Sequence, residues 1–226
     1  EGSRVTLIDR SDSPELRKTA GALEKEGAQI LLGTGAVPDG SFDLCVISPG
    51  FSPKAPWVAE VRRRGIDVLS EMELGWSRRK GPVIAVTGSN GKSTAVKWLA
   101  ESINQAGLRA NPGGNYGPPI CRMVMEEPDL DYLVMEVSSF QLESVRAFRA
   151  EAGILLNLNP NHLDRHGDMH TYLSAKARLF SQTKPEDACV VPEDLLDRVR
   201  ELSGGRGRWI SFGRSRKADY RFSKSV

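Results

Sequence analysis

The sequence predicts an α/β protein made of two successive units, each built on a parallel sheet. Short apolar runs alternate with segments of helical periodicity, a pattern typical of parallel sheets with covering helices. The chain has 226 residues, which is more than one typical domain needs. The best candidate linker is the polar stretch SRRKGP at 77–82, which contains Gly-Pro. We therefore expect one domain over residues 1–80 and a second over 81–226.

The first unit is predicted to contain four strands and two helices. Its first strand is RVTLID at 4–9, after which Ser13 caps a helix that begins at Pro14. Gly27 ends this helix, because glycine favours the position just after a helix C-terminus. Further strands are expected at 29–33, 43–50 and 67–70, with a second helix at 56–64.

The second unit continues the alternation. A buried strand at 82–88 leads through a glycine turn into a helix at 92–106. The apolar runs YLVMEVS at 132–138 and AGILLNL at 152–158 predict further strands. The remaining expected elements are helices at 171–182 and 193–202 and strands at 188–192 and 209–213.

Composition limits the classes of function. Thirty-one basic and twenty-nine acidic residues leave a formal charge of +2, so there is no electrostatic case for nucleic-acid binding. No apolar stretch approaches the ~18 residues of a membrane helix, and no leader pattern opens the chain. The three cysteines form no CxxC pair, which argues against a disulfide framework or a zinc cluster. We expect a soluble cytoplasmic protein that is a monomer.

Asp9 stands at the carboxyl end of the first expected strand. In Rossmann-like folds an acidic residue at this place follows a glycine-rich turn by about 20 residues and binds a ribose hydroxyl. No such turn precedes Asp9, so we infer that a strand, a glycine loop and a helix are missing from the N-terminus. The alternative is that Asp9 only caps a turn, and the spacing fits both interpretations.

The segment AVTGSNGKST at 85–94 departs from the common phosphate-loop pattern G-x-x-x-x-G-K-[ST], because Val86 stands where the first glycine should be. Gly91, Lys92 and Ser93 fill its last three positions. Such a turn places backbone N–H groups and a helix N-terminus against an anion, and an ordinary strand-to-helix turn has no need of these residues. We expect Lys92 to reach the terminal phosphates of ATP and Ser93 to bind magnesium.

Glu136 lies near the end of the expected strand at 132–138. Ligands of open α/β sheets collect at the carboxyl ends of the strands, where a carboxylate could hold magnesium directly or through water. The residues that follow offer further polar contacts: Ser138, Ser139 and Gln141. The alternative is that Glu136 is an acid that caps the next helix.

The segment HLDRHGDMH contains all the histidines of the chain, spaced by four residues: His162, His166 and His170. This spacing aligns ligands on a helix face, so one interpretation is a zinc site. Pro160 and Gly167 argue against one continuous helix, and a single histidine that joins a magnesium site is the other interpretation. On its residue type alone, Lys176 on the next helix is a solvated lysine.

Together these residues resemble the Mur ligases, the ATP-dependent amino-acid ligases of peptidoglycan synthesis. The resemblance runs from Asp9 to about Gly213, and the SSFQLE element makes it greatest to the members that join D-glutamate to UDP-N-acetylmuramoyl-L-alanine. In this family the short form TGSNGKST is the normal loop. The motifs that carry the resemblance are SPG (48–50), TGSNGKST (87–94), GGN (113–115), EVSSFQLE (136–143), NLNPNHLDRHG (157–167) and SAKARLF (174–180).

The resemblance implies roles for single residues. Lys92 would contact the transferring phosphoryl group of ATP, and Lys176 matches the lysine that the family carbamylates, which reverses its interpretation as a solvated residue. The ATP phosphates would be bound by Gly88, Ser89, Asn90, Gly91, Lys92, Ser93 and Thr94. Two magnesium ions would be held by Ser93, Glu136, His162 and Lys176.

The substrate contacts follow from the same resemblance. Asp9, Arg10 and Gly50 would bind the uridine diphosphate, although Arg10 is not a universal choice after the aspartate. Asn115 and Ser138 would face the muramoyl-alanine end. Two positions depart from the family pattern: Asn161 replaces a common acidic residue, which would weaken any orientation of His162, and Asn159 replaces a common threonine.

The implied reaction is an acyl-phosphate ligation. The alanyl carboxylate would attack the γ-phosphate of ATP, and the amine of D-glutamate would then displace phosphate. The family has three domains, of which this chain would hold part of the UDP-binding domain and part of the central ATPase, so the 226-residue chain is expected not to turn over. The alternatives are a Mur-type or folylpolyglutamate-type ligase for another amino acid, and a non-catalytic P-loop nucleotide-binding protein.

Overall fold

The structure, a computed structural model, describes residues 2–52 and 54–223 and confirms the α/β class. The chain divides into two compact units. The first contains the chain up to Cys45 together with Lys54–Val68, and the second contains a short segment from Val46 and the chain from Leu69 onward. The division passes through strands β3 (Leu44–Ile47) and β4 (Asp67–Ser70), which pair in a two-stranded sheet.

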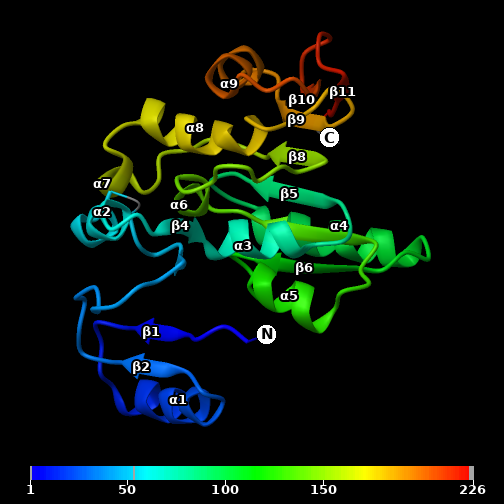
Figure 1. The fold of residues 1–226 in the computed structure, drawn as a ribbon. Coiled ribbons are helices and arrows are strands. Elements are labelled where there is room, and N and C mark those ends of the chain that lie inside the picture. Colours follow the sequence, from blue (N-terminus) through cyan, green and yellow to red (C-terminus); the bar gives the residue numbers. More distant parts are fainter. Residues whose placement is uncertain (1, 53, 224–226) are drawn as a thin grey trace. The chain divides into compact units, whose positions relative to one another are not determined.

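The first unit has the elements that its sequence predicts. Strands β1 (Thr6–Ile8) and β2 (Gln29–Leu31) pair in parallel, and helix α1 (Pro14–Lys25) connects them (Figure 1). The predicted cap is confirmed, because the Ser13 hydroxyl accepts a hydrogen bond from the backbone N–H of Leu16 at 3.2 Å. Helix α2 (Pro56–Arg63) precedes β4.

Helix α3 (Glu71–Arg78) is the first element that the sequence did not predict. It belongs to the second unit, which therefore begins before the expected linker at 77–82. Gly75 permits a close approach to α5 (Ile120–Glu126), because a Cβ at this position would lie 2.5 Å from Ile120 Cγ2. The assignment of 1–80 to UDP-substrate binding and of 81–226 to ATP binding stays a prediction.

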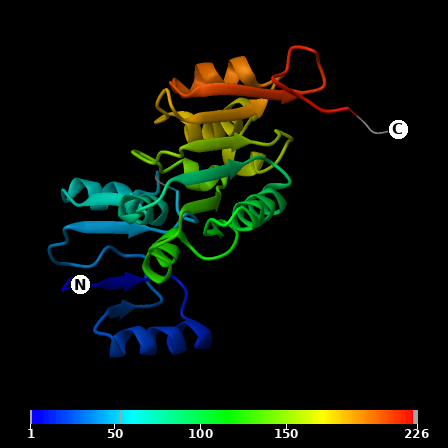
Figure 2. The ribbon, with the colours of Figure 1, turned by 90° about the vertical axis from the view of Figure 1, so that its right-hand side faces the viewer.

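The second unit is built on a seven-stranded sheet of order β11-β10-β9-β8-β5-β7-β6, in which the paired strands run parallel. Its strands lie side by side in Figures 1 and 2. Their bounds are β5 Val83–Thr87, β6 Ala110–Gly114, β7 Tyr132–Glu136, β8 Ala152–Leu155, β9 Ala188–Pro192, β10 Arg208–Gly213 and β11 Tyr220–Arg221.

Helices cover both faces of this sheet. On one face, Val96 of α4 (Lys92–Gln105) packs in a cluster with Val86 of β5. The next strand residue toward the N-terminus, Ala85, belongs to the cluster on the other face, as the alternation of a strand requires. That cluster is covered by α5, α6 (Ser139–Leu142), α8 (Met169–Ala177), the 3-10 turn Arg178–Phe180 and α9 (Leu196–Ser203). No helix of the described residues is long and apolar enough to cross a membrane.

Strand β6 was not predicted because its sequence is ANPGG. Proline and glycine are depleted in strands, but β6 is the edge of the sheet, where a missing N–H is tolerated. Gly114 has φ +92°, and a Cβ there would lie 2.4 Å from the carbonyl oxygen of Glu136. The glycine therefore lets β6 end close beside β7.

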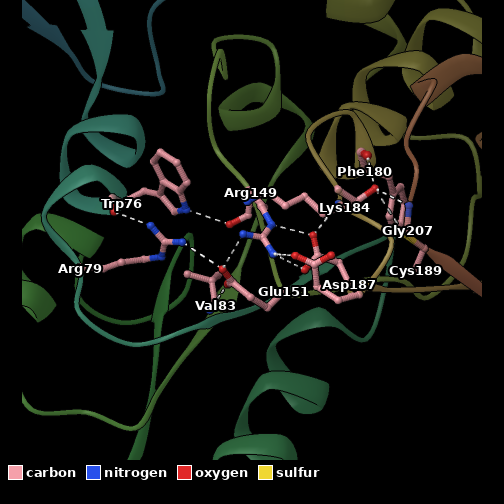
Figure 3. Close-up of polar contacts among 12 residues, drawn as sticks. Trp76, Arg79, Val83, Arg149, Glu151, Phe180, Lys184, Asp187, Cys189 and Gly207 are labelled. Atoms are coloured by element: carbon pink, nitrogen blue, oxygen red, sulfur yellow. Dashed lines mark hydrogen bonds and ion pairs between the residues drawn. The ribbon is translucent and has the colours of Figure 1, made fainter.

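Ion pairs and hydrogen bonds link the amino ends of three neighbouring strands (Figure 3). Arg149 binds Asp187, directly before β9, with Nε–Oδ2 and Nη2–Oδ1 distances of 2.7 and 2.6 Å. Glu151, directly before β8, accepts hydrogen bonds from the backbone N–H of Val83 at 2.7 Å and from Arg79 Nη2 at 3.0 Å. This network stabilises the sheet at the amino ends of its strands, whereas the predicted site lies at their carboxyl ends.

Candidate functional site

The carboxyl ends of four neighbouring parallel strands meet at one edge of the large sheet. Gly88 follows β5, Glu136 ends β7, Asn115 follows β6, and Asn157 lies two residues beyond β8. Because strand ends at such an edge bring their polar side chains together, the topology itself collects these residues.

The loop after β5 turns at two glycines with positive φ. Gly88 and Gly91 have φ values of +150° and +81°, which glycine adopts without strain. Gly91 is the N-cap of α4, so Lys92 is the first helical residue, and its Nζ donates to the carbonyl oxygen of Ser89 at 3.2 Å. The N-terminus of the 14-residue helix α4 therefore points its free N–H groups toward the loop.

Asn157 holds this loop in shape. Its Oδ1 accepts hydrogen bonds from the backbone N–H groups of Ser89 at 3.1 Å and Asn90 at 3.0 Å, and its Nδ2 donates to the carbonyl oxygen of Asn90 at 3.0 Å. The Ser89 hydroxyl bonds both backbone groups of Asn159 at 2.9 Å, so the side chain at position 159 does not enter these bonds. Sequence reasoning missed Asn157, although the rule that singled out Glu136 also applies to it.

Glu136 is buried and both of its carboxylate oxygens are bound. Oε2 accepts from Ser93 Oγ at 2.6 Å, and Oε1 accepts from Asn115 Nδ2 at 2.7 Å. The residue that caps α6 is Ser138, whose hydroxyl accepts from the backbone N–H of Gln141 at 3.2 Å, so Glu136 does not have the alternative role of a helix cap. The structure thus joins Ser93, Glu136 and Asn115 into one hydrogen-bonded chain beside the loop.

Lys176 is buried against the same loop, with 1% of its surface exposed. Its Nζ donates to the carbonyl oxygen of Gly88 at 3.0 Å and to Thr87 Oγ1 at 3.3 Å. Burial lowers the pKa of Lys176 from 10.5 to about 7, aided by Lys92 and opposed by Glu136. The interpretation of Lys176 as a solvated lysine is therefore wrong, because α8 packs this side chain beneath the loop.

The three histidines do not share a helix face. His162 has φ +53° and lies before the one-turn helix α7 (Leu163–His166), which ends at Gly167 with φ +81° before α8 begins. His162 is exposed with its ring 4.8 Å from Phe140, whereas His166 is buried. Among the described residues, no group of three His, Cys, Asp or Glu side chains is placed to hold a metal.

The predicted metal residues are brought together only in part. In the described part of the chain, no hydrogen bond or ion pair joins His162 to Glu136 or Lys176, so its metal role stays a prediction. Ser93 and Glu136 do meet, and they offer the hard oxygen ligands that Mg²⁺ prefers. Mg²⁺ usually keeps several waters and takes one or two carboxylates with substrate phosphates, so this donor set fits it.

Three residues are expected to bind uridine diphosphate, and each has its own surroundings in the structure. Asp9 Oδ1 accepts a hydrogen bond from the backbone N–H of Ser11 at 2.8 Å, so Asp9 does cap a turn. Arg10 lies against Gly35, where a Cβ would approach Arg10 Nε to 2.6 Å, and Gly50 has open space where a Cβ would stand. A role of these residues in UDP binding stays a prediction.

Comparison with known proteins adds the family. Residues 86–226 match the sequence model of a family described as "Mur ligase middle domain". The chain is 34% identical over 216 residues to the UDP-N-acetylmuramoylalanine–D-glutamate ligase of Acidobacterium capsulatum, covering 94% of this chain and 47% of that protein. It is 38% identical over 223 residues to the ligase of the same name from Pelotomaculum thermopropionicum, with 96% and 48% covered. The chain thus spans about half the length of these relatives.

Solved structures share the fold. The UDP-N-acetylmuramate:L-alanyl-γ-D-glutamyl-meso-diaminopimelate ligase of Neisseria meningitides matches with a TM-score of 0.57 at 19% identity, over 94% of this chain and 71% of that one. The MurF ligase of Thermotoga maritima, solved with ADP, matches with a TM-score of 0.56 at 16% identity, over 95% and 49%. Because the family match covers more than half of the residues, this chain belongs to the Mur ligase family.

Proposed function

We propose that the polypeptide to which this chain belongs joins D-glutamate to UDP-N-acetylmuramoyl-L-alanine in an ATP-dependent ligation. The observation that carries the proposal is the cluster at the sheet edge, where Lys92, the Ser93–Glu136 pair and buried Lys176 surround one phosphate-type loop. The names of the relatives at 34% and 38% identity support the choice of substrates.

The loop residues bind the phosphates of ATP in this proposal. The residues from Gly88 to Thr94 surround the anion, the free N–H groups at the N-terminus of α4 face it, and Lys92 lies at the first helical position to contact the transferring phosphoryl group. Asn157 keeps the loop in its binding conformation before the nucleotide arrives, which lowers the entropic cost of binding.

Ser93 and Glu136 would hold the first Mg²⁺, with His162 and Lys176 at the second. Magnesium supplies positive charge that offsets the charge of the transferring phosphoryl group. Asn115 orients the Glu136 carboxylate through Oε1 and leaves Oε2 toward Ser93. The hydrogen-bond donors around Glu136 keep it positioned as an oxygen ligand.

Lys176 is suited to carbamylation because burial keeps a large fraction of its amine neutral near pH 7. The nitrogen lone pair attacks the carbon of CO₂, one N–C bond forms, one C–O π bond opens with its electron pair going to oxygen, and the nitrogen loses a proton to solvent. The product is an anion in place of a cation, which the charge of Lys92 favours and the charge of Glu136 opposes.

The substrate side of the proposal rests on the family motifs. Asp9, Arg10 and Gly50 bind the uridine diphosphate, while Asn115 and Ser138 face the muramoyl-alanine end. The alanyl carboxylate attacks the γ-phosphorus, ADP leaves, and an acyl phosphate forms. The amine of D-glutamate then attacks the acyl carbon, phosphate leaves, and the ammonium proton passes to solvent. Phosphorylation is needed because an ionised carboxylate is a poor electrophile.

Ligation by the longest natural polypeptide that contains this chain tests the proposal. ATP, Mg²⁺ and UDP-N-acetylmuramoyl-L-alanine are offered with D-glutamate, L-alanine, L-lysine or meso-diaminopimelate, and the product is identified by mass. We expect ligation of D-glutamate alone, and Lys92→Ala should lower kcat by on the order of a hundredfold. Lys97→Ala, an exposed lysine on the same helix, is the matched control.

Each contrary result of the ligation assay supports a different function. Preference for another amino acid would replace the substrate assignment by another Mur-type or folylpolyglutamate-type ligase. Nucleotide binding without ligation of any amino acid would support the non-catalytic alternative. We also expect the 226-residue chain alone to bind the UDP-substrate weakly without turnover, and measured ligation by this chain would contradict that.

A further inference from the structure

His166 is buried, with 6% of its surface exposed, and the proposed reaction gives it no role. Its Nε2 lies 2.9 Å from Ser139 Oγ, and its Nδ1 lies 3.5 Å from Glu143 Oε1. A carboxylate beside Nδ1 favours the tautomer with the proton on Nδ1, so Nε2 accepts from the Ser139 hydroxyl. Ser139 is the first residue of α6, directly after Ser138.

The other side of the imidazole packs against Tyr172, whose ring lies next to Lys176. The ring centroid of His166 lies 5.1 Å from that of Tyr172 on α8. The Tyr172 ring lies 4.6 Å from Lys176 Nζ, and its hydroxyl lies 3.4 Å from Ser89 Oγ in the phosphate-type loop. His166 is therefore in contact both with the turn that carries Ser138 and with the aromatic ring under Lys176.

A buried histidine at position 166 costs more free energy than an apolar side chain would. A buried imidazole loses hydration and needs partners for both ring nitrogens, whereas an apolar side chain would fill the same volume without them. Phe140, stacked on His166 at 5.6 Å, already supplies apolar packing. The hydrogen bond to Ser139 fixes the position of α6 relative to α7, which apolar contact alone does not fix.

We infer that His166 is a positioning residue, which couples the Ser138–Ser139 turn to the packed side chains of Tyr172 and Lys176. It holds the substrate-facing turn and the buried amine in one arrangement, and it does not itself touch the reacting atoms. The inference rests on the proposed function for the role of the two parts, but the coupling between them is testable without any substrate.

The first measurement is the reactivity of the Lys176 amine in the longest natural polypeptide that contains this chain. Acetic anhydride is applied near pH 7 in CO₂-free buffer with EDTA, and acetylation is quantified by peptide mass spectrometry. His166→Leu keeps the volume without the hydrogen bond, and His166→Gln keeps an acceptor within reach of Ser139. His170→Leu, at an exposed histidine, is the matched control, and exposed Lys97 is the reference amine in each sample.

We expect His166→Leu to change the acetylation rate of Lys176 by about three- to tenfold relative to Lys97, the equivalent of one hydrogen bond. The reason is that release of the Tyr172 ring alters both the access of the reagent to this amine, which is 1% exposed, and its hydration. His166→Gln should stay within about twofold of the wild type. If His166→Leu does not fold, His166→Asn replaces it, because its shorter amide is polar and does not reach Ser139.

The second measurement separates positioning from general destabilisation. In the ligation assay, His166→Leu should raise the KM for the UDP-sugar by a similar factor, with His166→Gln restoring the wild-type value and His170→Leu leaving it unchanged. Equal Lys176 reactivity in Leu, Gln and wild-type proteins, or an equal effect of His170→Leu, would overturn the inference. Absence of ligation in the wild type would refute the proposed function, while the acetylation result would still decide the role of His166.

Discussion

Replacing Lys176 by Met should stabilise the substrate-free protein at acid and neutral pH, because it removes a buried cation. Lys176 is 1% exposed, and burial lowers its pKa from 10.5 to about 7. Between about pH 7 and pH 10.5, the unfolded chain holds a proton on this amine that the folded chain has released. The free energy of unfolding of the wild type therefore rises with pH across this window, and the variant lacks the rise.

The size of the effect follows from the pKa. The difference of 10.5 − 7, about 3.5, corresponds to about 5 kcal/mol at about 1.4 kcal/mol per pKa unit, which is an upper limit. Met also loses the hydrogen bonds to Gly88 and Thr87, worth about 1 kcal/mol each. We expect the variant to be more stable by about 2 to 4 kcal/mol near pH 6, with the difference passing through zero at alkaline pH and the variant about 1 kcal/mol less stable than the wild type near pH 10.

Urea unfolding in CO₂-free buffers with EDTA, at about pH 6, 8 and 10, measures this difference. Lys97→Met is the control, because Lys97 is exposed and its replacement should have a small effect that does not vary with pH below about 9. A difference between Lys176→Met and the wild type that is the same at every pH would refute the lowered pKa. It would also remove the physical reason for a neutral amine at this place.

Three further substitutions test the packing and the loop. Gly75→Ala should lower the free energy of unfolding by about 1 to 3 kcal/mol, because its Cβ would meet Ile120; an unchanged urea midpoint would contradict the α3–α5 contact. Glu73→Gln should cost about 1 to 3 kcal/mol and speed hydrogen exchange at 146–148, whose backbone N–H groups bind this buried carboxylate; unchanged exchange would show that these bonds are unimportant. Asn157→Ala should raise the Kd for ATP, measured by calorimetry, by about tenfold, and an equal Kd would mean that the loop needs no support.

Local rules of sequence predicted most of the fold. Periodicity, Ser13 and the glycines that end helices placed α1, α2 and α4 within a residue or two, because these signals act over one helical turn. The strand β6 could not be predicted from ANPGG, since its pairing with β7 comes from the sheet and not from strand propensity. Helix α3 was missed because its glycine, Gly75, is explained only by the close contact with α5.

The site was predictable where position along a strand decides the outcome. Glu136 and the loop meet because parallel strands end at the same edge, and the sequence shows where those strands end. The burial of Lys176 and the different environments of His162 and His166 depend on how α7 and α8 pack. Such tertiary contacts have no signature in the spacing of the residues, and only the family resemblance pointed to Lys176.

A crystal structure of the chain with Mn²⁺ and a non-hydrolysable ATP analogue tests the central claim most directly, since anomalous scattering locates the metal. The account predicts phosphates over Gly88–Thr94 beside Lys92, and a metal bound to Ser93 Oγ or the Glu136 carboxylate in place of the 2.6 Å hydrogen bond between them. An unbroken Ser93–Glu136 bond, with the nucleotide or the metal bound elsewhere, would contradict it.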